Sequence, residues 1–400
     1  MAVSVVKLLK NATSPGPGYN IPGAVLLAAN KSGNTIFFHA QGYTSVDESV
    51  AKPITADAIF WIASCTKLMT TISALQCVER GLLALDEDVS RVLPELKSKN
   101  ILTGFTGTKT PIFQKATRNI TLRHLLTHSS GLGYDFLSPT LKAWQEWNSI
   151  DISTSRTRGN LAKEYDLPLL FEPGEGWEYG VGIDWVGRMI ERVHGRKLGD
   201  YMREHIWEPL GMESTTFHLD GNEDLQRRLC LPTLRHSSGE LTPAPKFHQS
   251  DPEDDLGGGG IYTSPRDYMQ VLTTILQNDG KLLKPETVDL MFQPHLVSDT
   301  HIKAKVAGEA GAMYRAGVDS DGWNFGLGGI LNTEDVEGVC KKGTLTWGGL
   351  PNLYWWIDPA AGNCGLYASQ VLPPADKSSM DVSVAFRRDI NQASECDDIA

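Results

Sequence analysis

The fold and chemistry of this chain are decided by residues 61–69, which read Trp61-Ile62-Ala63-Ser64-Cys65-Thr66-Lys67-Leu68-Met69. Ser64 and Lys67 stand three positions apart, so a helix would place both side chains on one side. Ser64 is expected at the start of that helix and Gly81 at its end. A serine alkoxide, and the oxyanion formed when it attacks a carbonyl, are both stabilised by the positive end of a helix. A buried lysine of lowered pKa can take up the serine proton, so the pair suggests nucleophilic catalysis.

A Ser-x-x-Lys pair is weak evidence by itself, because most such pairs are ordinary helix starts. Ser4-Val5-Val6-Lys7 has the same pattern, in an N-terminal stretch bounded by Pro and Gly where we expect nothing to bury it. Cys65 is an alternative nucleophile beside Ser64, but the sequence offers it no helical base of its own. Other parts of the chain therefore have to decide between these interpretations.

The composition narrows the class of protein. A chain of 400 residues with 41% hydrophobic and 21% charged residues is typical of a globular protein with two lobes, or one large domain with insertions. The net charge of −11 argues against nucleic acid or an anionic membrane as a partner. No apolar run approaches the roughly 20 residues that span a bilayer. The N-terminus lacks a signal-peptide pattern, so we expect a cytosolic (cytoplasmic) protein. The six scattered cysteines, without Cys-x-x-Cys, are predicted to be buried free thiols.

Strand patterns occur at both ends of the chain. Ala24–Ala29 and Thr35–Phe38 flank a Gly/Asn turn and predict a hairpin, and a short strand over 58–61 leads to Ser64. Four more strands are expected near the C-terminus, at 324–330, 343–350, 352–358 and 364–368, with helices at 264–278 and 376–391. We therefore predict an α+β fold, in which strands from both ends share one antiparallel sheet flanked by helices, with an all-helical lobe between them.

Three patterns that would indicate a metal or a nucleotide are incomplete. His124 and His128 stand four apart but lack the Glu of His-Glu-x-x-His, so we interpret them as polar groups that tie a turn together. In the acidic stretch that starts at Asp251, position twelve of an EF-hand loop would be Tyr262 instead of Glu. The run Gly257–Gly260 lacks the Lys-Ser/Thr of a P-loop, and we expect it to let the backbone approach the helix that follows Ser64.

A third candidate side chain comes from residues 171–180, a Pro/Gly-rich stretch that predicts a tight loop. This loop delivers Tyr179 just before an amphipathic helix. A tyrosine at such a junction usually serves packing. Beside a Ser-Lys pair it could instead act as a phenolate or a proton shuttle, provided that a cation lowers its pKa.

With these pieces in order, the chain resembles the serine β-lactamase and penicillin-binding-protein superfamily, which carries Ser-x-x-Lys, then Tyr-x-Asn or Ser-Asp-Asn, then Lys-Thr-Gly. Ser64–Lys67 matches the first motif. Tyr179–Val181 stands in the place of the second, after the Pro173-Gly174-x-x-Trp177 lead-in typical of the class C-like branch, and Trp347–Gly349 stands in the place of the third. The resemblance runs from Ile21 to about residue 390. It implies a single β-lactamase-like domain over 1–400, with an α/β lobe of about 1–85 and 257–400 and a helical lobe of about 86–256.

Two departures from the family pattern narrow the chemistry. Val181 replaces the Asn that binds the amide of a β-lactam, and Trp347 replaces the Lys that pairs with the carboxylate of the drug. Class C-like carboxylesterases share both losses. Four stretches are also similar to the fungal acyltransferases of lovastatin-type polyketide biosynthesis: Lys67–Val89, Ile120–Leu132, Trp177–Gly187 and Thr344–Asp358. The resemblance therefore points to esters or thioesters and puts penicillin hydrolysis in doubt.

The resemblance implies acyl transfer through a covalent serine ester. Ser64 would attack the donor, and Lys67 and Tyr179 would relay the proton, with Tyr179 as the base toward the acceptor. The backbone N–H groups of Ser64 and Leu350 would hold the oxyanion. A second alcohol, or water, would then take the acyl group in a ping-pong cycle. No metal or organic cofactor is implied. The implied partners are a small-molecule ester or thioester and an alcohol acceptor, and an acyl carrier protein is a further candidate as the donor's carrier.

The resemblance also suggests substrate-binding residues and leaves two functions open. The expected lining residues are Trp347, Gly348, Gly349, Tyr134 and Trp355, and core packing is an equally good interpretation of the three aromatic ones. An acyltransferase of secondary metabolism and a carboxylesterase would use the same catalytic residues, because they differ only in whether a bulky alcohol or water reaches the acyl-enzyme. The intact Ser64, Lys67 and Tyr179 argue against a non-catalytic binding protein. The absence of Gly-x-Ser-x-Gly argues against a Ser-His-Asp hydrolase of that type.

Overall fold

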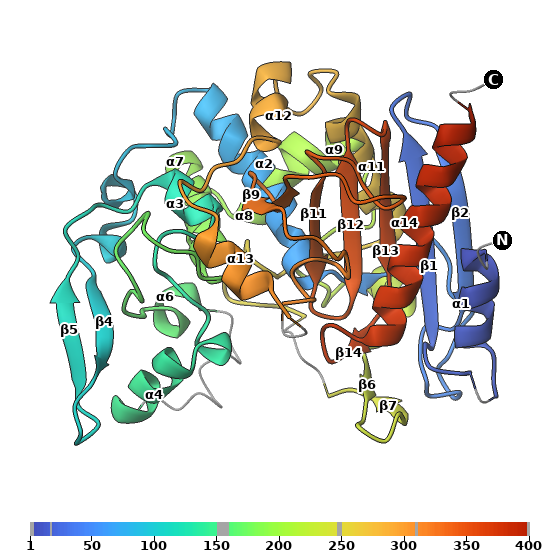
Figure 1. The fold of residues 1–400 in the computed structure, drawn as a ribbon, viewed down its shortest axis with the longest axis horizontal. Coiled ribbons are helices and arrows are strands. Elements are labelled where there is room, and N and C mark those ends of the chain that lie inside the picture. The colour runs from blue at the N-terminus through green and yellow to red at the C-terminus, as the bar shows by residue number, and fades with distance from the viewer. Residues whose placement is uncertain (1–3, 17, 150–159, 246–249, 309–310, 398–400) are drawn as a thin grey trace.

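A seven-stranded antiparallel sheet forms one half of the molecule, on the right in Figure 1, with the strand order β2-β1-β13-β12-β11-β10-β9. The structure is a computed structural model and describes residues 4–16, 18–149, 160–245, 250–308 and 311–397. The strands are β1 (Gly23–Asn30), β2 (Thr35–Gly42), β9 (Trp323–Phe325), β10 (Ile330–Asn332), β11 (Leu345–Gly349), β12 (Leu353–Asp358) and β13 (Asn363–Ala368). Because β1 pairs with β13, strands from both ends of the chain share one sheet, as predicted.

Helices cover both faces of this sheet, so β1 is buried on both sides and reads as a continuous apolar run. Val25 and Leu27 belong to the core on the face covered by α2 (Thr66–Glu79) and α11 (Pro265–Gln277). Leu26 and Ala28 belong to a second core under α1 (Val5–Thr13) and α14 (Lys377–Asp397), which lie together in front of the sheet in Figure 1. The predicted α+β architecture, an antiparallel sheet flanked by helices, is therefore confirmed.

The N-terminal helix α1 corrects one expectation. We expected nothing to bury the stretch that contains Ser4-Val5-Val6-Lys7, but Val5 and Leu9 are fully buried and pack in the second core. Ser4 is the residue before α1, and Lys7 points into solvent. This second Ser-x-x-Lys pair is thus an ordinary helix start.

The section between the two groups of strands is mostly helical but not entirely so. It carries two hairpins, and the second of these joins β14 (Val371–Leu372) in a small sheet. Its helices are α3 (Leu122–Leu126), α4 (Pro139–Trp147), α6 (Leu161–Glu164), α7 (Gly182–His194), α8 (Leu198–Met202), α9 (Glu208–Leu210) and α10 (Glu223–Arg227). Its hairpins are β4 (Asn100–Phe105) with β5 (Pro111–Lys115), and β6 (Thr233–Arg235) with β7 (Leu241–Pro243). The boundaries of the two lobes stay a prediction.

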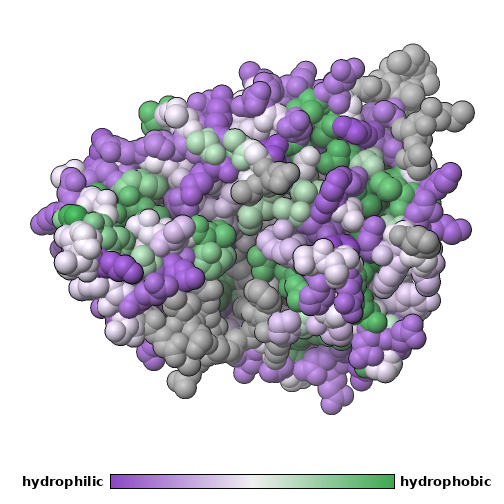
Figure 2. Space-filling view, turned by 60° about the horizontal axis from the view of Figure 1, so that its bottom comes forward, coloured by the Kyte–Doolittle hydropathy of each residue, from purple (hydrophilic) through white to green (hydrophobic). Residues whose placement is uncertain are grey.

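The remaining elements are short. Strand β3 (Phe60–Trp61) pairs with β8 (Tyr262–Thr263) in a separate two-stranded sheet, so it leads to Ser64 from outside the central sheet. The others are α12 (Pro285–Met291), α13 (Thr300–Val306), the 3₁₀ turns Ala63–Cys65, Val89–Arg91, Pro94–Leu96 and Asp135–Leu137, and a π-helical turn at Arg203–Trp207. No helix in the described ranges is long and apolar enough to cross a membrane. The face shown in Figure 2 is largely hydrophilic, with apolar side chains in small groups.

Helix α2 lies in the middle of the molecule, between the sheet and the helices α7 and α8 (Figure 1). Most of its residues are buried, including polar ones such as Lys67, Thr70 and Ser73. Buried polar side chains need hydrogen-bond partners, and backbone carbonyls provide them for Ser73 and Thr70. Ser73 donates to the carbonyl of Met69 (2.9 Å), and Thr70 donates to the carbonyl of Gly257 (2.7 Å). A helix that is buried all round can fix the position of its side chains tightly, which suits a helix that carries Lys67.

Candidate active site

Ser64 lies in a tight turn at the start of α2. The turn is the 3₁₀ segment Ala63–Cys65, which α2 continues from Thr66, so Ser64 is at the N-terminal end of the helical stretch as predicted. Ala63, directly before it, has φ of 43°, a left-handed conformation that is uncommon for a residue with a Cβ. Ser64 itself is half-buried, whereas Ala63 and Cys65 are buried. Local strain next to a partly exposed hydroxyl is a frequent feature of functional sites.

Three predicted side chains meet at the Ser64 hydroxyl. The Tyr179 hydroxyl donates a hydrogen bond to Ser64 Oγ at 2.6 Å. Lys67 Nζ lies 3.4 Å from the same oxygen and 4.8 Å from the centre of the Tyr179 ring. These groups come from the turn before α2, from α2 itself and from the loop before α7. The structure therefore brings together the Ser-x-x-Lys pair and the tyrosine, which are far apart in the sequence.

The Gly257–Gly260 run lies against this group, as the sequence predicted. Lys67 Nζ donates to the carbonyl of Gly258 at 2.5 Å, and Thr70 of the same helix donates to the carbonyl of Gly257. A Cβ on Gly258 would come within 2.2 Å of a carboxylate oxygen of Asp184. Only glycine lets the backbone approach α2 and α7 this closely, so this run supplies backbone carbonyls to the site.

Two further groups complete a buried polar network. The Tyr134 hydroxyl accepts a hydrogen bond from Lys67 (3.1 Å) and donates one to Asp184 Oδ2 (3.0 Å). The other oxygen, Asp184 Oδ1, accepts from the N–H of Gly258 (2.8 Å). We expected Tyr134 to line the substrate site or to pack in the core. Its hydroxyl in addition joins the lysine to a carboxylate, and its contact with a substrate stays a prediction. Asp184 was not predicted. The available signal was an acidic residue between the buried Ile183 and Trp185 of α7.

Burial sets the protonation of these groups. It lowers the pKa of Lys67 to about 8, and the Asp184 carboxylate opposes this shift only in part. Burial raises the pKa of Tyr179 above its ordinary value, and the hydrogen bond with Ser64 offsets only part of the rise. The condition under which we expected Tyr179 to act as a phenolate, a lowered pKa, is therefore not met. The amine of Lys67 is the group that can be neutral near pH 8.

Cys65 is unsuited to be the nucleophile. Its side chain is fully buried, and burial raises the pKa of its thiol, so the reactive thiolate is disfavoured. Cys77, Cys230, Cys340 and Cys364 are also buried free thiols, as predicted, and the side chain of Cys396 lies outside the described part of the chain.

The end of strand β11 runs close to the turn that carries Ser64. A Cβ on Gly349 would come within 2.4 Å of the carbonyl oxygen of Ile62 and 3.4 Å of Cys65 Sγ. Glycine is therefore required at this position, and Leu350 follows it directly in a turn. An oxyanion hole formed by the N–H groups of Ser64 and Leu350 needs such an approach of strand and turn. Gly348 also meets neighbouring backbone, with the carbonyl of Leu353 at 2.8 Å from a Cβ built there.

An aromatic cluster packs behind Tyr179. The Trp347 ring lies 5.2 Å from Tyr179, 5.9 Å from Tyr314 and 5.5 Å from Phe325, measured between ring centres. The sequence did not predict that Tyr314 packs beside Tyr179 and Trp347, because Tyr314 belongs to the stretch 281–322, which shows no clear pattern. Trp355 pairs with Trp347 across β11 and β12 and is only 1% exposed, which favours the core-packing interpretation for its side chain.

The histidines act as the turn-tying interpretation predicted. His124 Nδ1 accepts from the N–H of Thr121, and His128 Nδ1 accepts from the N–H of Gly180, both at 3.3 Å. Within the described residues, no group of three or more His, Cys, Asp or Glu side chains is arranged to hold a metal ion.

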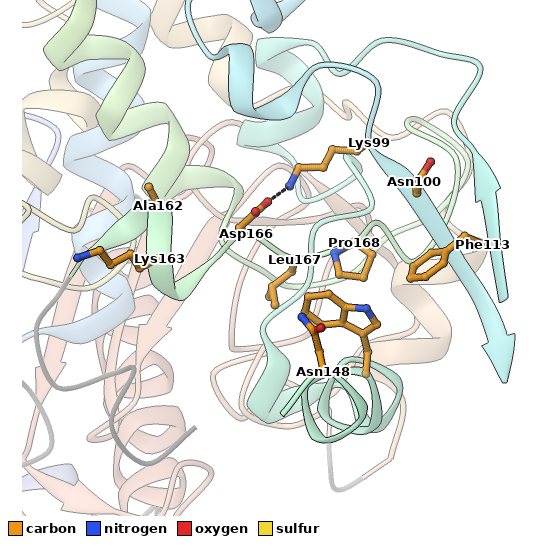
Figure 3. Close-up of a pocket in the computed structure, with 10 residues that line it drawn as sticks. Lys99, Asn100, Phe113, Asn148, Ala162, Lys163, Asp166, Leu167 and Pro168 are labelled. Atoms are coloured by element: carbon orange, nitrogen blue, oxygen red, sulfur yellow. Dashed lines mark hydrogen bonds and ion pairs between the residues drawn. The ribbon is translucent and has the colours of Figure 1, made fainter. Parts of the chain in front are cut away.

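A separate cavity of about 480 Å³ lies between the hairpin β4–β5 and the helices α4 and α6 (Figure 3). Phe113 and Leu167 contribute to its lining, and Lys99 forms an ion pair with Asp166 at its side. None of Ser64, Lys67 and Tyr179 lines this cavity. The candidate active site is therefore defined by the reacting groups around Ser64.

The chain is similar to known proteins over almost its whole length. The β-lactamase family model matches residues 9–387. The chain is 40% identical over 380 residues to a lovastatin esterase of Penicillium rubens, covering 92% of this chain and 94% of the relative. It is 38% identical over 389 residues to a monacolin J acid methylbutanoyltransferase of Aspergillus terreus, covering 92% and 91%. The unliganded simvastatin synthase of Aspergillus terreus superimposes with a TM-score of 0.89 at 36% identity, covering 97% of both chains. The chain therefore belongs to the β-lactamase family.

Proposed function

We propose that this protein is a serine-dependent acyltransferase. It takes an acyl group from an ester or thioester onto Ser64 and passes it to an alcohol group of a polyketide-type secondary metabolite. The observation that carries the proposal is the shared contact at Ser64 Oγ, which Tyr179 reaches at 2.6 Å and Lys67 at 3.4 Å. The relatives named as acting on monacolin J acid and on lovastatin support the substrate class.

Lys67 is the proposed base that activates Ser64. Its neutral amine has two N–H donors and one lone pair. The donors are used by the carbonyl of Gly258 and by the hydroxyl of Tyr134, which itself donates to Asp184. The lone pair is then left for the hydroxyl proton of Ser64. The network thus orients the amine for proton abstraction, and the lowered pKa of about 8 makes its neutral form available.

Tyr179 is the proposed proton carrier between this pair and the substrate. Its raised pKa keeps it a phenol, which donates to Ser64 Oγ and stabilises the oxygen as negative charge develops. In acylation, the Ser64 Oγ–carbon bond forms and the carbon–oxygen or carbon–sulfur bond of the donor breaks. The Ser64 proton passes to Lys67, and the leaving group receives a proton through Tyr179. In the second half of the cycle the acceptor alcohol reverses these steps and releases Ser64.

The oxyanion of each tetrahedral intermediate is assigned to the N–H groups of Ser64 and Leu350. The close approach of Gly349 to Ile62 supports this proposal, because it holds the end of β11 against the Ser64 turn. Trp347 occupies the place of the family's lysine, and we propose that Trp347 with Gly348 and Gly349 borders the acyl group.

A carboxylesterase is the second candidate function, favoured by the 40% identity to the lovastatin esterase. One experiment separates the two. The protein is incubated with a p-nitrophenyl ester or a simple alkyl thioester, with and without a polycyclic alcohol, and the products are analysed by mass. A transferase yields the ester of the alcohol as the main product. If free acid remains the main product at saturating alcohol, the protein is an esterase.

Two finer points stay predictions. The proposal agrees with the small-molecule substrate in the name of the related acyltransferase. It stays a prediction that an acyl carrier protein delivers the acyl group. A cytosolic location also stays a prediction.

A further inference from the structure

We propose that His128 is a positioning residue, which holds the Tyr179 hydroxyl on Ser64 by fixing the backbone on both sides of Tyr179. The inference deepens the proposed function and rests on it, because Tyr179 is part of the proposed proton path. His128 lies in the turn after α3, and nothing in the reaction itself requires it to touch the substrate.

The evidence is a pair of hydrogen bonds that bracket Tyr179. The backbone N–H of Glu178, before Tyr179, donates to the carbonyl of His128 at 3.0 Å. The backbone N–H of Gly180, after Tyr179, donates to Nδ1 of the His128 ring at 3.3 Å. The carbonyl of Tyr179 itself accepts from the N–H of Tyr134 at 3.2 Å. Among these three bonds, the imidazole provides the one that depends on a side chain.

The ring of His128 also supports the Tyr179 ring directly. The two ring centres lie 4.8 Å apart in an edge-on arrangement, and Phe325 packs edge-on against the imidazole at 5.3 Å. His128 is only 1% exposed, so its ring has little freedom to move. The backbone and the ring of Tyr179 are therefore both held by one residue, and its hydroxyl is left to reach Ser64.

Two features of His128, its backbone conformation and an unpaired ring nitrogen, are unfavourable for folding, and packing alone does not explain them. Its φ is 57°, a left-handed conformation that is uncommon for a residue with a Cβ. Because Nδ1 accepts from Gly180, the ring proton is on Nε2, and this buried atom has no hydrogen-bond partner within the described residues. Strained backbone conformations occur preferentially at functional sites, and an unpaired buried donor requires an explanation. Burial, with the nearby Lys67, holds the pKa of His128 well below its usual range, which keeps the Nδ1 acceptor available.

The same geometry argues against His128 as a base. The lone pair of Nδ1 is used by the N–H of Gly180, and Nε2 carries the proton. Neither nitrogen can accept the proton of Ser64. The residue acts through Tyr179, and the chemistry stays with Ser64 and Lys67.

Two substitutions separate positioning from packing. In His128→Asn, the side-chain amide oxygen reaches the place of Nδ1, and asparagine tolerates a positive φ. In His128→Gln, the side chain fills more of the ring's volume, but its amide lies beyond the place of Nδ1. We expect His128→Asn to keep kcat for a p-nitrophenyl ester within about 3-fold of the parent enzyme. We expect His128→Gln to lower kcat by about 10–100-fold with little change in KM, since misplacing a catalytic group by about 1 Å can cost about 100-fold in rate.

The opposite order would overturn the inference. If His128→Gln is as active as His128→Asn or more active, the residue serves as a space filler. Melting temperatures of both variants are measured alongside, and a kcat that follows the melting temperature and not the acceptor position also overturns it.

A third comparison distinguishes this inference from the proposed function. In a Tyr179→Phe background, His128→Gln should cost little further activity, because the two residues act through one hydroxyl. If the double variant loses activity by the product of the two single losses, the positioning role of His128 is overturned, while the proposed function is unaffected. If Tyr179→Phe retains the parent activity, the proposed proton path fails, and the role of His128 fails with it. Acylation of Ser64 is detected by mass spectrometry and tests the proposed function independently of the roles of Tyr179 and His128.

Discussion

The Tyr134 hydroxyl stands between Lys67 and Asp184, accepting from the amine at 3.1 Å and donating to the carboxylate at 3.0 Å. The carboxylate thus acts on the amine through a phenol. Burial can then lower the pKa of Lys67 to about 8 while Asp184 still holds the amine in place through Tyr134 and through the Gly258 backbone. Each of these groups makes a specific contribution that substitution can isolate.

Tyr134→Phe should reduce activity while preserving the ring. The change removes the acceptor that orients the Lys67 amine and leaves Asp184 Oδ2 without its donor. A catalytic group misplaced by about 1 Å can cost about 100-fold in rate, so we expect kcat to fall by about 10–100-fold. Steady-state kinetics with a p-nitrophenyl ester measure this. Tyr367→Phe, a buried tyrosine in the core on the other face of the sheet, is the matched control and should stay near the parent rate. Equal rates for the two variants would mean that Tyr134 is a packing residue.

The pH dependence reports the state of Lys67. The base must be neutral, so kcat/KM should rise with pH through about 8 and level off above it. The Asp184 carboxylate raises the pKa of Lys67, and Asp184→Asn removes this effect. The rise should therefore move to lower pH in Asp184→Asn, while kcat falls because the network is disturbed. A profile measured from about pH 6 to 10 in both proteins checks this. A shift to higher pH would contradict the proposed electrostatic coupling.

Tyr179→Phe keeps the aromatic ring and removes only the hydroxyl that donates to Ser64. General acid–base groups supply about 10²–10⁴-fold in rate, and we expect a loss of that size with an unchanged melting temperature. Lys67→Ala should cost at least as much, and the double variant little more, because members of one proton path are not additive. Activity within a few-fold of the parent in Tyr179→Phe would reassign the proton path to Lys67 alone.

Penicillin turnover should be poor. Val181 is fully buried at the start of α7, and Trp347 lies in β11. By the resemblance, they stand where the family has its β-lactam-binding asparagine and the lysine that pairs with the drug's carboxylate. Val181 lacks the side-chain amide of the asparagine, and Trp347 lacks the positive charge of the lysine. Parallel assays with a chromogenic β-lactam and a p-nitrophenyl ester compare the two substrates. Comparable kcat/KM values for both would show that these two replacements do not set specificity.

The sequence predicted those features that depend on local pattern and motif order. The hairpin β1–β2 and the strands β11 to β13 follow from periodicity and turn signals. The meeting of Tyr179 with Ser64 and Lys67 was implied by the resemblance to the β-lactamase and penicillin-binding-protein superfamily. The contacts of Asp184 could not be predicted, since its partners Tyr134 and Gly258 are distant in sequence and one acidic residue in the first turn of a helix is ordinary.

The protonation states of the site residues could not be predicted from the sequence either. The pKa of Tyr179 depends on how deeply the ring is buried and which charges surround it. Burial raises this pKa, so the condition that the sequence analysis set for a phenolate is not met. The burial of α1 was missed for a related reason, because the sheet face and α14 that cover it come from distant parts of the chain.

Covalent acylation of Ser64 is the central step, and intact-protein mass spectrometry after brief exposure to a p-nitrophenyl ester tests it most directly. We predict a single acyl adduct that peptide mapping places on Ser64 and that is absent from Ser64→Ala, together with loss of turnover in that variant. An adduct on Cys65 or elsewhere, or turnover that survives Ser64→Ala, would contradict the mechanism.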